Sequence, residues 1–568
     1  MSELNIYKAS AGAGKTFALT MEYFKIIFSV PSEYRNILAV TFTNKATEEM
    51  KSRIINELHC MAEGRPSGYA PGLKERFGFS DDELRNRAKM LRTLLLHDYG
   101  RISVTTIDRF FQRIVKSFTK ELGIFPGYNV ELDSEYVLMK AVDKVMEEVK
   151  RNASLRTWIA DLMDAKVDEG KSWSIKSRII DLGEELFREN YMLFDSSVQE
   201  KFGDKEFLKT YGAFLQSVIQ EYEEGLTRLS REAIGLIEGA GLELRDFRGN
   251  KAGCAAHFYK IKNRKFDEIT KTVRDSADQM DYWIAKDSDG SVKQRIESIY
   301  PLLNEKLKKC AEIYDTKCRY YLSARQIADN LYQLGILSDL YKEVRAYCDE
   351  KGVMLLSDTT HILNVLIAGN DTSFLYEKVG NYYKHLMIDE FQDTSSMQWG
   401  NFRPLVVNSL SEGNEAMIVG DVKQSIYRWR NGDWSLLAEG VESEFRRFGT
   451  NEVVLGNNWR SAQEIVGFNN LFFRKAATLL KTLFDEAAGE DNRWSGAIEK
   501  AYAGIEQIAK SAAKGYVDIC FGPLKKEEGA AESIMETVIG DIRSITERGG
   551  RSGDIVILVR SGKEGAFV

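Results

Sequence analysis

The amino-acid sequence predicts an α/β fold in which a parallel sheet domain is interrupted by a large α-helical insertion. Short β-branched runs alternate with helical patterns in the first and last parts of the chain, which indicates parallel strands joined by crossover helices. Between residues 131 and 352, apolar residues recur at helical spacing and β-branched runs are few. The simplest arrangement is a sheet domain that begins before the insertion and is completed after it.

Each predicted strand is a short run of apolar and β-branched residues. The longest helical patterns of the insertion lie at residues 135–150 and 302–350. The chain stops soon after its last predicted strand, so we expect it to be part of a longer protein. The predicted strands cover residues 4–7, 36–41, 101–106, 385–388, 415–419, 453–455, 517–521 and 555–559.

Length and composition limit the possible functions. A chain of 568 residues is long for one hydrophobic core, and roughly three or four domains are expected. The net charge of −7 argues against a bulk attraction to nucleic acid, so any such binding needs a local basic, aromatic groove. Six scattered cysteines without a C-x-x-C pair argue against zinc, iron–sulfur and disulfide sites and favour a reducing, cytoplasmic location. We expect neither an export signal nor a membrane-spanning segment.

A glycine-rich loop directly follows the first predicted strand, and a helical pattern opens at Phe17. Glycines let backbone N–H groups approach phosphates, and a helix N-terminus adds positive potential. Lys15 would reach the β- and γ-phosphates, and the Thr16 hydroxyl would ligate Mg²⁺. The predicted nucleotide-binding residues are Ala9, Ser10, Ala11, Gly12, Ala13, Gly14, Lys15 and Thr16.

An acidic pair follows the predicted strand at residues 385–388. Asp389 is predicted to hold Mg²⁺, usually through water, and Glu390 to orient or deprotonate the attacking water. An acidic turn after a strand is common by itself, but in a chain that also carries a phosphate-binding loop it indicates catalysis. The two motifs together predict a site that hydrolyses a nucleoside triphosphate with Mg²⁺.

Two segments after later strands combine aromatic, amide and arginine side chains. Gln424 stands where it could meet a γ-phosphate, and Trp429 between two arginines is typical of a base-stacking platform. Trp459 could stack on adenine, and Arg460 could reach a γ-phosphate across a cleft. For each tryptophan the alternative is a core anchor beside surface arginines, and each segment taken alone favours that alternative.

Two earlier segments are equally ambiguous when taken alone. Thr41, Phe42 and Asn44 suit backbone phosphates and a stacked base, but an N-cap with a core phenylalanine explains them as well. The second such segment is residues 105–111, which includes Thr106. A basic run at residues 260–265 favours a solvated helix face over a contact with duplex DNA.

Taken in order, these segments resemble the motif series of the UvrD/Rep superfamily I DNA helicases. The amino-acid sequence of the phosphate-binding loop is similar to that of the RecB/AddA branch, the motor subunits of recombination helicase–nucleases. Residues 41–46 match the first DNA-contact motif, and residues 389–393 match Walker B. Residues 420–430 match the Gln/Trp motif, and residues 458–461 match the first arginine motif.

The resemblance implies RecA-like lobes with helical insertions, ATP between the lobes, and 3′-to-5′ movement along single-stranded DNA in repair or recombinational break processing. It also implies duplex junctions as substrates and a nuclease/helicase partner subunit. It divides the chain into a first part of the ATP-binding lobe, a helical insertion, a second part of that lobe and an incomplete second lobe. These are residues 1–130, 131–352, 353–452 and 453–568.

The resemblance also implies a role for each matched residue. Glu390, Gln424 and Arg460 would act in catalysis, and Trp459 would contact the adenine in place of the family's usual tyrosine. The implied DNA-binding residues are Thr41, Phe42, Asn44, Thr106 and Trp429.

The chain departs from the family pattern at several places. No glutamine motif precedes Ala9, and Asp108 stands where many relatives have histidine. Neither the second lobe's transition-state arginine nor a nuclease carboxylate cluster occurs before Val568. We therefore expect this stretch alone to bind Mg–ATP weakly and hydrolyse it slowly, because an arginine finger is typically worth ~10³–10⁵ in rate. Two other functions remain open: a DNA-binding scaffold subunit with little turnover, and a P-loop NTPase that acts on RNA or protein.

Overall fold

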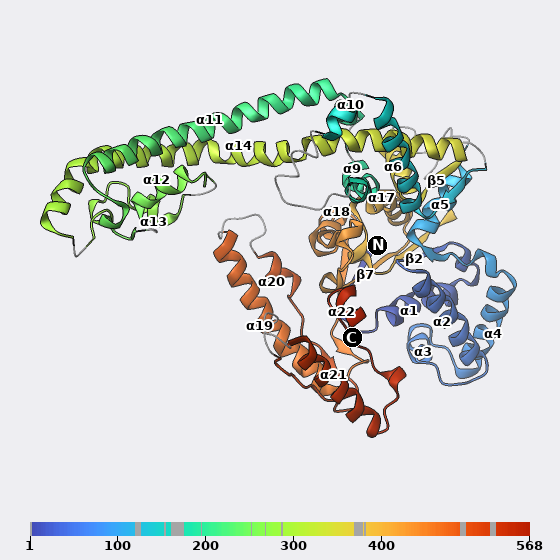
Figure 1. Ribbon diagram of the computed structural model, residues 1–568. Helices are drawn as coiled ribbons and strands as arrows, with labels where there is room; N and C mark the ends of the chain where they lie inside the picture. The colour runs from blue at the N-terminus through green and yellow to red at the C-terminus, as the bar shows by residue number, and fades with distance from the viewer. Residues whose placement is uncertain are drawn as a thin grey trace.

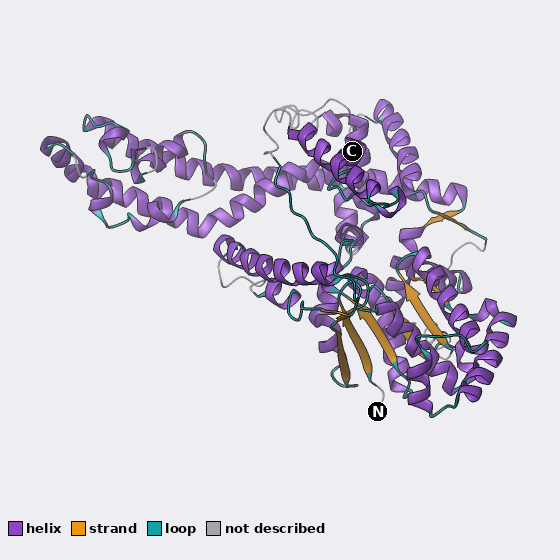
Figure 2. Cartoon of the chain, turned by 90° about the horizontal axis from the view of Figure 1, so that it is seen from below, coloured by secondary structure: helices purple, strands orange, loops and turns teal. Residues whose placement is uncertain are grey.

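A six-stranded parallel sheet forms the centre of the computed structural model, as the sequence predicts (Figure 1, Figure 2). Its order is β3-β2-β6-β7-β1-β8. The strands are β1 (Leu4–Ala9), β2 (Ile37–Thr41), β3 (Val104–Thr106), β6 (His385–Ile388), β7 (Ala416–Gly420) and β8 (Thr450–Leu455). The structure describes residues 3–119, 127–152, 155–160, 175–192, 194, 196–250, 253–266, 269–285, 288–368, 379, 382–488, 496–522 and 530–567.

Two apolar cores cover the two faces of this sheet. Successive residues of a strand point to opposite faces, so Leu38 and Val40 enter one core while Ile37 and Ala39 enter the other. Both faces of the central strands are buried, as is usual for parallel sheets with helices on each side. One face is covered by α1 (Lys15–Ser29), α2 (Asn44–Ala62) and α4 (Asp81–His97), and the other by α5 (Ile107–Ser117), α15 (Leu356–Ala368) and α17 (Ser396–Ser411).

The insertion is helical, and its longest helices lie side by side as an extended arm (Figure 1). In the arm, α11 (Lys205–Gly239) packs along α14 (Gly290–Lys351) around an apolar core. A second core joins α14 to α6 (Ser134–Arg151) near the sheet. Although α14 has 62 residues, no helix within the described ranges is both long and apolar enough to cross a lipid bilayer.

The helix α14 begins before the predicted start at residue 302 and runs through Pro301. A proline inside a helix removes a backbone hydrogen bond and disfavours the turn before it. Ile296 and Leu303 lie on either side of Pro301 and are both fully buried in the arm's core. Packing of these side chains therefore outweighs the local effect of the proline.

The chain leaves the sheet domain and returns to it at one place. There β4 (Asn129–Glu131) and β5 (Val353–Leu355) pair as parallel strands, although the whole insertion separates them in sequence. The paired strands attach the helical arm to the sheet domain through two adjacent connections.

The first sheet extends further along the chain than the sequence suggests. Residues 453–455 belong to β8, which pairs with β1 from Thr450 to Leu455 as an edge strand. The predicted boundary at residue 452 would cut this strand. A short ladder of β9 (Asn457–Asn458) and β10 (Ile508–Ala509) follows, together with α19 (Gln463–Ala488) and α21 (Ala530–Glu547).

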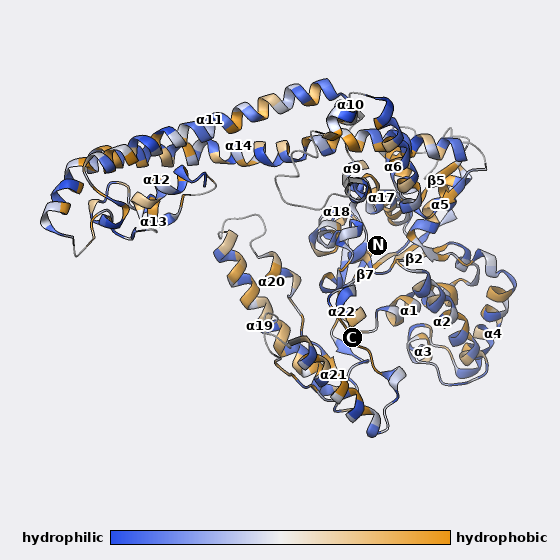
Figure 3. Cartoon of the chain, in the orientation of Figure 1, coloured by the Kyte–Doolittle hydropathy of each residue, from blue (hydrophilic) through white to orange (hydrophobic). Residues whose placement is uncertain are grey.

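The strands predicted at residues 517–521 and 555–559 are wrong. Neither run joins a ladder, and Phe521 and Leu558 are 93% and 90% exposed. Apolar residues also run along α19, whose buried side chain is Val466 (Figure 3). A β-rich run becomes a strand only where a neighbouring strand accepts its hydrogen bonds, and the described residues offer none beside these two runs.

Candidate nucleotide site and nucleic-acid surface

The glycine-rich loop connects β1 to α1, as the sequence predicts. Gly12 and Gly14 have φ angles of 76° and 91°, in the left-handed region that glycine adopts without strain. The loop closes through a hydrogen bond from the Ala13 N–H to the Ser10 carbonyl, 3.1 Å long. α1 begins at Lys15 directly after Gly14, so the loop and the first turn of the helix present their N–H groups together.

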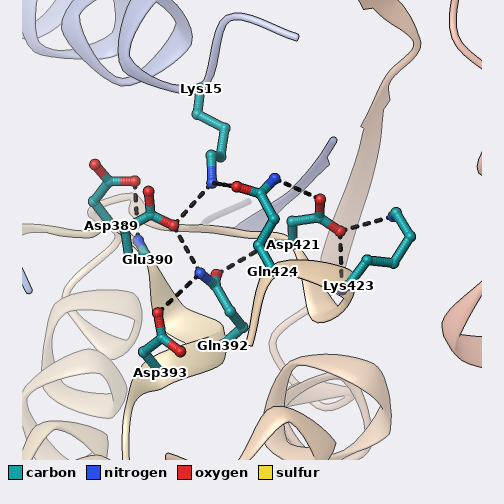
Figure 4. A network of polar contacts seen from close by, with 8 residues as sticks. All are labelled: Lys15, Asp389, Glu390, Gln392, Asp393, Asp421, Lys423 and Gln424. Atoms are coloured by element: carbon teal, nitrogen blue, oxygen red, sulfur yellow. Dashed lines mark hydrogen bonds and ion pairs between the residues drawn. The ribbon is translucent and has the colours of Figure 1, made fainter. Parts of the chain in front are cut away.

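The carboxyl ends of β1, β6 and β7 meet at one edge of the sheet and bring distant residues together (Figure 4). The Lys15 Nζ lies 2.8 Å from Glu390 Oε2 and 3.4 Å from Gln424 Oε1. The Gln424 Nε2 donates in turn to Asp421 Oδ2 at 2.6 Å. The predicted phosphate-binding lysine therefore contacts the predicted catalytic glutamate and glutamine directly.

The two carboxylates after β6 have different surroundings. Asp389 is buried, and this burial, followed by the charge of Glu390, raises the pKa of Asp389 to about 6, while Lys15 acts in the opposite direction. Glu390 is partly exposed and has a φ of 50°, which is uncommon for a residue with a side chain. Its contacts with Lys15 and the rest of the cluster hold it in this conformation.

Gln392 connects the predicted catalytic glutamate, Glu390, to the neighbouring strand end, and sequence reasoning assigned Gln392 no role. Its Nε2 donates to Glu390 Oε2 at 2.7 Å and to Asp393 Oδ2 at 3.2 Å, and its Oε1 accepts from the Asp421 N–H at 2.9 Å (Figure 4). The side chain is 1% exposed, and a Cβ on Gly420 would lie 2.7 Å from its Oε1. In the sequence, Gln392 stands out as an amide between acidic residues that follow a predicted strand. The sequence does not show that this side chain is buried.

The other side of the site comes from the chain after β8. The Trp459 N–H donates to the Gly12 carbonyl at 3.0 Å, and Arg460 follows it. Both line a pocket of about 650 Å³ together with the phosphate-binding loop. Phe17, Arg53 and Gly68 also line it and were not predicted; Phe17 stacks on Tyr69 with 4.4 Å between ring centroids. The full lining is Ala11, Gly12, Ala13, Gly14, Lys15, Thr16, Phe17, Arg53, Gly68, Glu390, Gln424, Trp459 and Arg460.

These residues fit a magnesium–nucleotide complex. A lysine, two arginines and the N-terminus of α1 line the pocket and suit an anionic phosphate chain. Thr16 lines the pocket, and Asp389 directly precedes the pocket-lining Glu390, so a hydroxyl and a carboxylate are close to the phosphates' expected position. Oxygen ligands of this kind are those that Mg²⁺ prefers. Ala9 is the buried last residue of β1 and directly precedes the loop.

A cluster of aromatic rings lies on the same edge of the sheet. The Phe42 and Tyr427 ring centroids are 4.7 Å apart, and those of Tyr427 and Trp429 are 5.9 Å apart. The Arg430 guanidinium lies 4.7 Å from the Trp429 centroid, and Trp429 is 62% exposed. Two predicted DNA-binding residues thus share one surface, joined by Tyr427, which sequence reasoning missed. We refer to Phe42, Tyr427, Trp429 and Arg430 as the aromatic platform.

The predicted phosphate contacts are placed less uniformly. Thr41 and Thr106 are paired residues of β2 and β3, so the two segments do end side by side. Thr41 is buried, however, and its hydroxyl hydrogen-bonds Thr47 Oγ1 at 2.7 Å, so it shapes the turn and does not face solvent. Thr106 caps α5 by accepting the Arg109 N–H, and Asn44 is exposed at the start of α2. The N-cap alternative for Thr106 is confirmed.

A carboxyl group from the insertion contacts the segment that follows Glu390. Glu189 of α9 (Glu189–Met192) accepts a hydrogen bond from the hydroxyl of Ser395, the N-cap of α17. Burial raises the pKa of Glu189 to about 7, opposed by its hydrogen bonds from Ser395 and Met397. Burial also raises the pKa of Asp108, opposed by the charge of Arg430. The charge of Arg430 therefore acts on the acidic residue at position 108.

Comparisons with known proteins point to one family. The chain is 24% identical to the exonuclease/helicase subunit RexA of Lactococcus lactis subsp. cremoris over 98% of its own length and 46% of that protein. It is 24% identical to an ATP-dependent helicase/nuclease subunit of Acetivibrio thermocellus over 87% of its length and 41% of that protein. It thus spans less than half of these relatives. A family model for the UvrD/REP helicase N-terminal domain matches residues 2–443, and the chain belongs to this family.

Proposed function

We propose that this chain forms the ATP-binding part of a helicase that uses Mg–ATP hydrolysis to move along single-stranded DNA. One observation carries the proposal: Lys15, Glu390 and Gln424 come from three distant places in the sequence and meet in one hydrogen-bonded cluster beside the phosphate-binding loop. Membership of the helicase family and the names of the relatives support the same function.

The phosphate chain would bind to the loop between Gly12 and Thr16, with the Lys15 ammonium on the β- and γ-phosphates. Thr16 and Asp389 would hold the Mg²⁺, which when bound neutralises charge on the phosphates. Trp459 and Phe17 line the pocket beside the loop and offer aromatic faces to the base. Arg460 lines the same side and would carry positive charge toward the γ-phosphate.

The contact between Lys15 and Glu390 suggests how bound nucleotide would make Glu390 available as a general base. In the structure the Lys15 ammonium pairs with the Glu390 carboxylate. A bound triphosphate competes for the lysine, because phosphate oxygens form strong charge-assisted hydrogen bonds with it. Glu390, still held by Gln392, then has its carboxylate available to accept a proton from the attacking water. Gln424 loses the same lysine contact and would be free to meet the γ-phosphate.

The nucleic acid would lie across the carboxyl edge of the sheet. The aromatic platform offers the exposed ring of Trp429 and two partly exposed rings for base stacking, and an arginine for the phosphate backbone. We propose 3′-to-5′ movement, a role in repair of broken DNA, duplex junctions as substrates and a helicase–nuclease partner subunit. The relatives' names as helicase/nuclease subunits support the helicase activity and the partner subunit. The direction, the repair role and the junctions rest on the motif resemblance.

The test measures ATP turnover of the full-length protein with single-stranded DNA, with RNA and without nucleic acid, alongside the Lys15→Ala variant. Single-stranded DNA should stimulate turnover, and Lys15→Ala should abolish it. Streptavidin should be displaced faster from the 5′ end of a biotinylated strand than from the 3′ end. Stimulation by RNA alone would favour an RNA-dependent NTPase, and ATP binding without turnover would favour a scaffold subunit.

A further inference from the structure

A residue far along the chain contacts the backbone of the phosphate-binding loop. The Ala11 carbonyl accepts two side-chain amide hydrogen bonds, one from Asn458 Nδ2 and one from Gln507 Nε2, each 3.1 Å long. The two amides also bind each other, because Asn458 Nδ2 donates to Gln507 Oε1 at 2.9 Å. The three groups form a closed triangle around one carbonyl of the loop.

The position of Gln507 is itself fixed by its neighbours. Its N–H donates to Asn470 Oδ1 at 3.1 Å, and its carbonyl accepts from Asn470 Nδ2 at 2.9 Å. The next residue, Ile508, begins β10, and its N–H donates to the Gly456 carbonyl at 2.8 Å. Gln507 therefore reaches the loop from a backbone that α19 and β9 hold on both sides.

The geometry of a peptide links this carbonyl to the phosphates. The bond between Ala11 and Gly12 is planar and trans, so its C=O and N–H point in opposite directions. Asn458 and Gln507 bind the carbonyl and neither of them lines the pocket, from which we infer that the carbonyl points away from the pocket. The Gly12 N–H is thereby directed to the other side, where the phosphates would lie.

Gly12, the next residue of the phosphate-binding loop, also lies close to residues 458–460. A Cβ on Gly12 would lie 2.8 Å from Asn458 Oδ1 and 3.0 Å from Arg460 Cβ. The Gly12 carbonyl accepts from the Trp459 N–H. Two successive peptides of the loop are therefore oriented by the chain after β8, so the loop's shape depends on contacts outside the first sheet.

We propose that Gln507 is a positioning residue for nucleotide binding, which acts by holding the Ala11 carbonyl and so aiming the Gly12 N–H at the phosphates. Gln507 lies outside the residues that match the family model, which end at residue 443. The proposal rests on the nucleotide site described above. Loss of one such hydrogen bond should weaken Mg–ATP binding by about 3- to 10-fold.

The experiment compares Gln507→Met with Gln463→Met in the 568-residue chain. Methionine keeps a similar shape and removes the amide donor. Gln463 is the matched control, because its amide donates to the Ser511 carbonyl in the same segment at 3.3 Å and does not contact the loop. Binding of fluorescent Mg–ATP gives the dissociation constant, thermal melting gives stability, and single-turnover hydrolysis gives the rate for bound nucleotide.

We expect Gln507→Met to raise the dissociation constant by about 3- to 10-fold, with unchanged melting temperature and unchanged rate for bound nucleotide. Gln463→Met should match the unaltered chain. Asn470→Ala, which releases the backbone of Gln507, should weaken binding in the same direction. Unchanged affinity in Gln507→Met, or an equal loss in both methionine variants, would overturn the proposal. If Lys15→Ala bound nucleotide as well as the unaltered chain, the nucleotide site itself would be refuted instead.

Discussion

The two walls of the nucleotide site differ in how the fold holds them. The carboxylate wall, formed by Asp389, Glu390, Gln392 and Asp421, sits at the ends of the central strands β6 and β7, and three of these side chains are buried. The opposite wall carries Trp459, which is 66% exposed. Its N–H and the side chain of Asn458, a residue of a two-stranded ladder, donate hydrogen bonds to the loop. In the proposed function the chemistry would take place on the wall held by the sheet, whereas the nucleotide's adenine would bind against the wall with few buried contacts.

The sharpest test of this difference is Glu390→Gln on the carboxylate wall. The amide cannot accept a proton from water, so turnover should fall by about 10²–10⁴-fold. Binding of Mg–ATP should persist, because the loop and Lys15 remain. Single-turnover hydrolysis and nucleotide titration measure the two effects, with Glu452→Gln as a control outside the pocket. Equal loss of binding and turnover would show that Glu390 is structural.

Lys15→Ala should have the next largest effect, on binding itself. Removal of a charge-assisted contact with phosphate should weaken Mg–ATP binding by about 10- to 100-fold. Lys8→Ala is a matched control, since Lys8 lies on β1 and pairs with Glu452 at 2.8 Å outside the pocket. Nucleotide titration of both variants gives the comparison. A similar loss in both would contradict the assignment of Lys15.

Substitutions of two exposed tryptophans test whether the wall that carries Trp459 and the aromatic platform bind different ligands. Trp459→Ala should weaken Mg–ATP binding by about 2- to 10-fold through loss of aromatic contact, and should leave binding of single-stranded DNA unchanged. Trp429→Ala should do the reverse and weaken DNA binding by about 5- to 50-fold. Fluorescence titrations with nucleotide and with an oligonucleotide check both. If each variant lost both affinities, the two surfaces would not be separate.

The smallest effect is expected behind the carboxylate wall, at Glu189. A carboxyl whose pKa rises from 4.5 to about 7 on folding binds its proton more tightly in the folded state. Its contribution to stability is therefore present below about pH 4.5 and is lost as the pH rises through about 7. As the pH rises from about 4.5 to about 7, the melting temperature of the unaltered chain should fall relative to that of Glu189→Gln.

Melting curves of both chains between about pH 5 and pH 8 measure this difference, where the window follows from the raised pKa. Glu185→Gln is the control, because Glu185 is a nearby exposed carboxylate that pairs with Arg188 at 2.9 Å. The control should follow the unaltered chain. A constant difference between Glu189→Gln and the unaltered chain at all pH values would contradict the buried-carboxyl account.

Much of the sheet and of the carboxylate wall could be predicted from the sequence. Apolar runs such as residues 385–388 form strands because both of their faces become buried. Parallel strands share a carboxyl edge, so motifs that follow such runs were expected to converge there. The contacts of Lys15 with Glu390 and Gln424 confirm this expectation.

The remaining features depend on neighbours that a sequence does not display. Residues 517–521 and 555–559 have strand-like composition but no partner among the described residues, so composition alone was misleading. Gln392 is a positioning group only because Gly420 leaves room for its amide. Gln507 reaches Ala11 across nearly the whole chain, and no local pattern marks a side chain that binds a distant carbonyl.

The central claim is that the phosphate-binding loop and Asp389 share one metal–nucleotide complex. Electron paramagnetic resonance of Mn²⁺, used in place of Mg²⁺, tests it most directly. The chain should bind Mn²⁺ tightly only when ATP is present, and Asp389→Asn should weaken Mn–ATP binding while ATP binding in EDTA stays the same. Equal Mn–ATP binding by Asp389→Asn and the unaltered chain would contradict the claim.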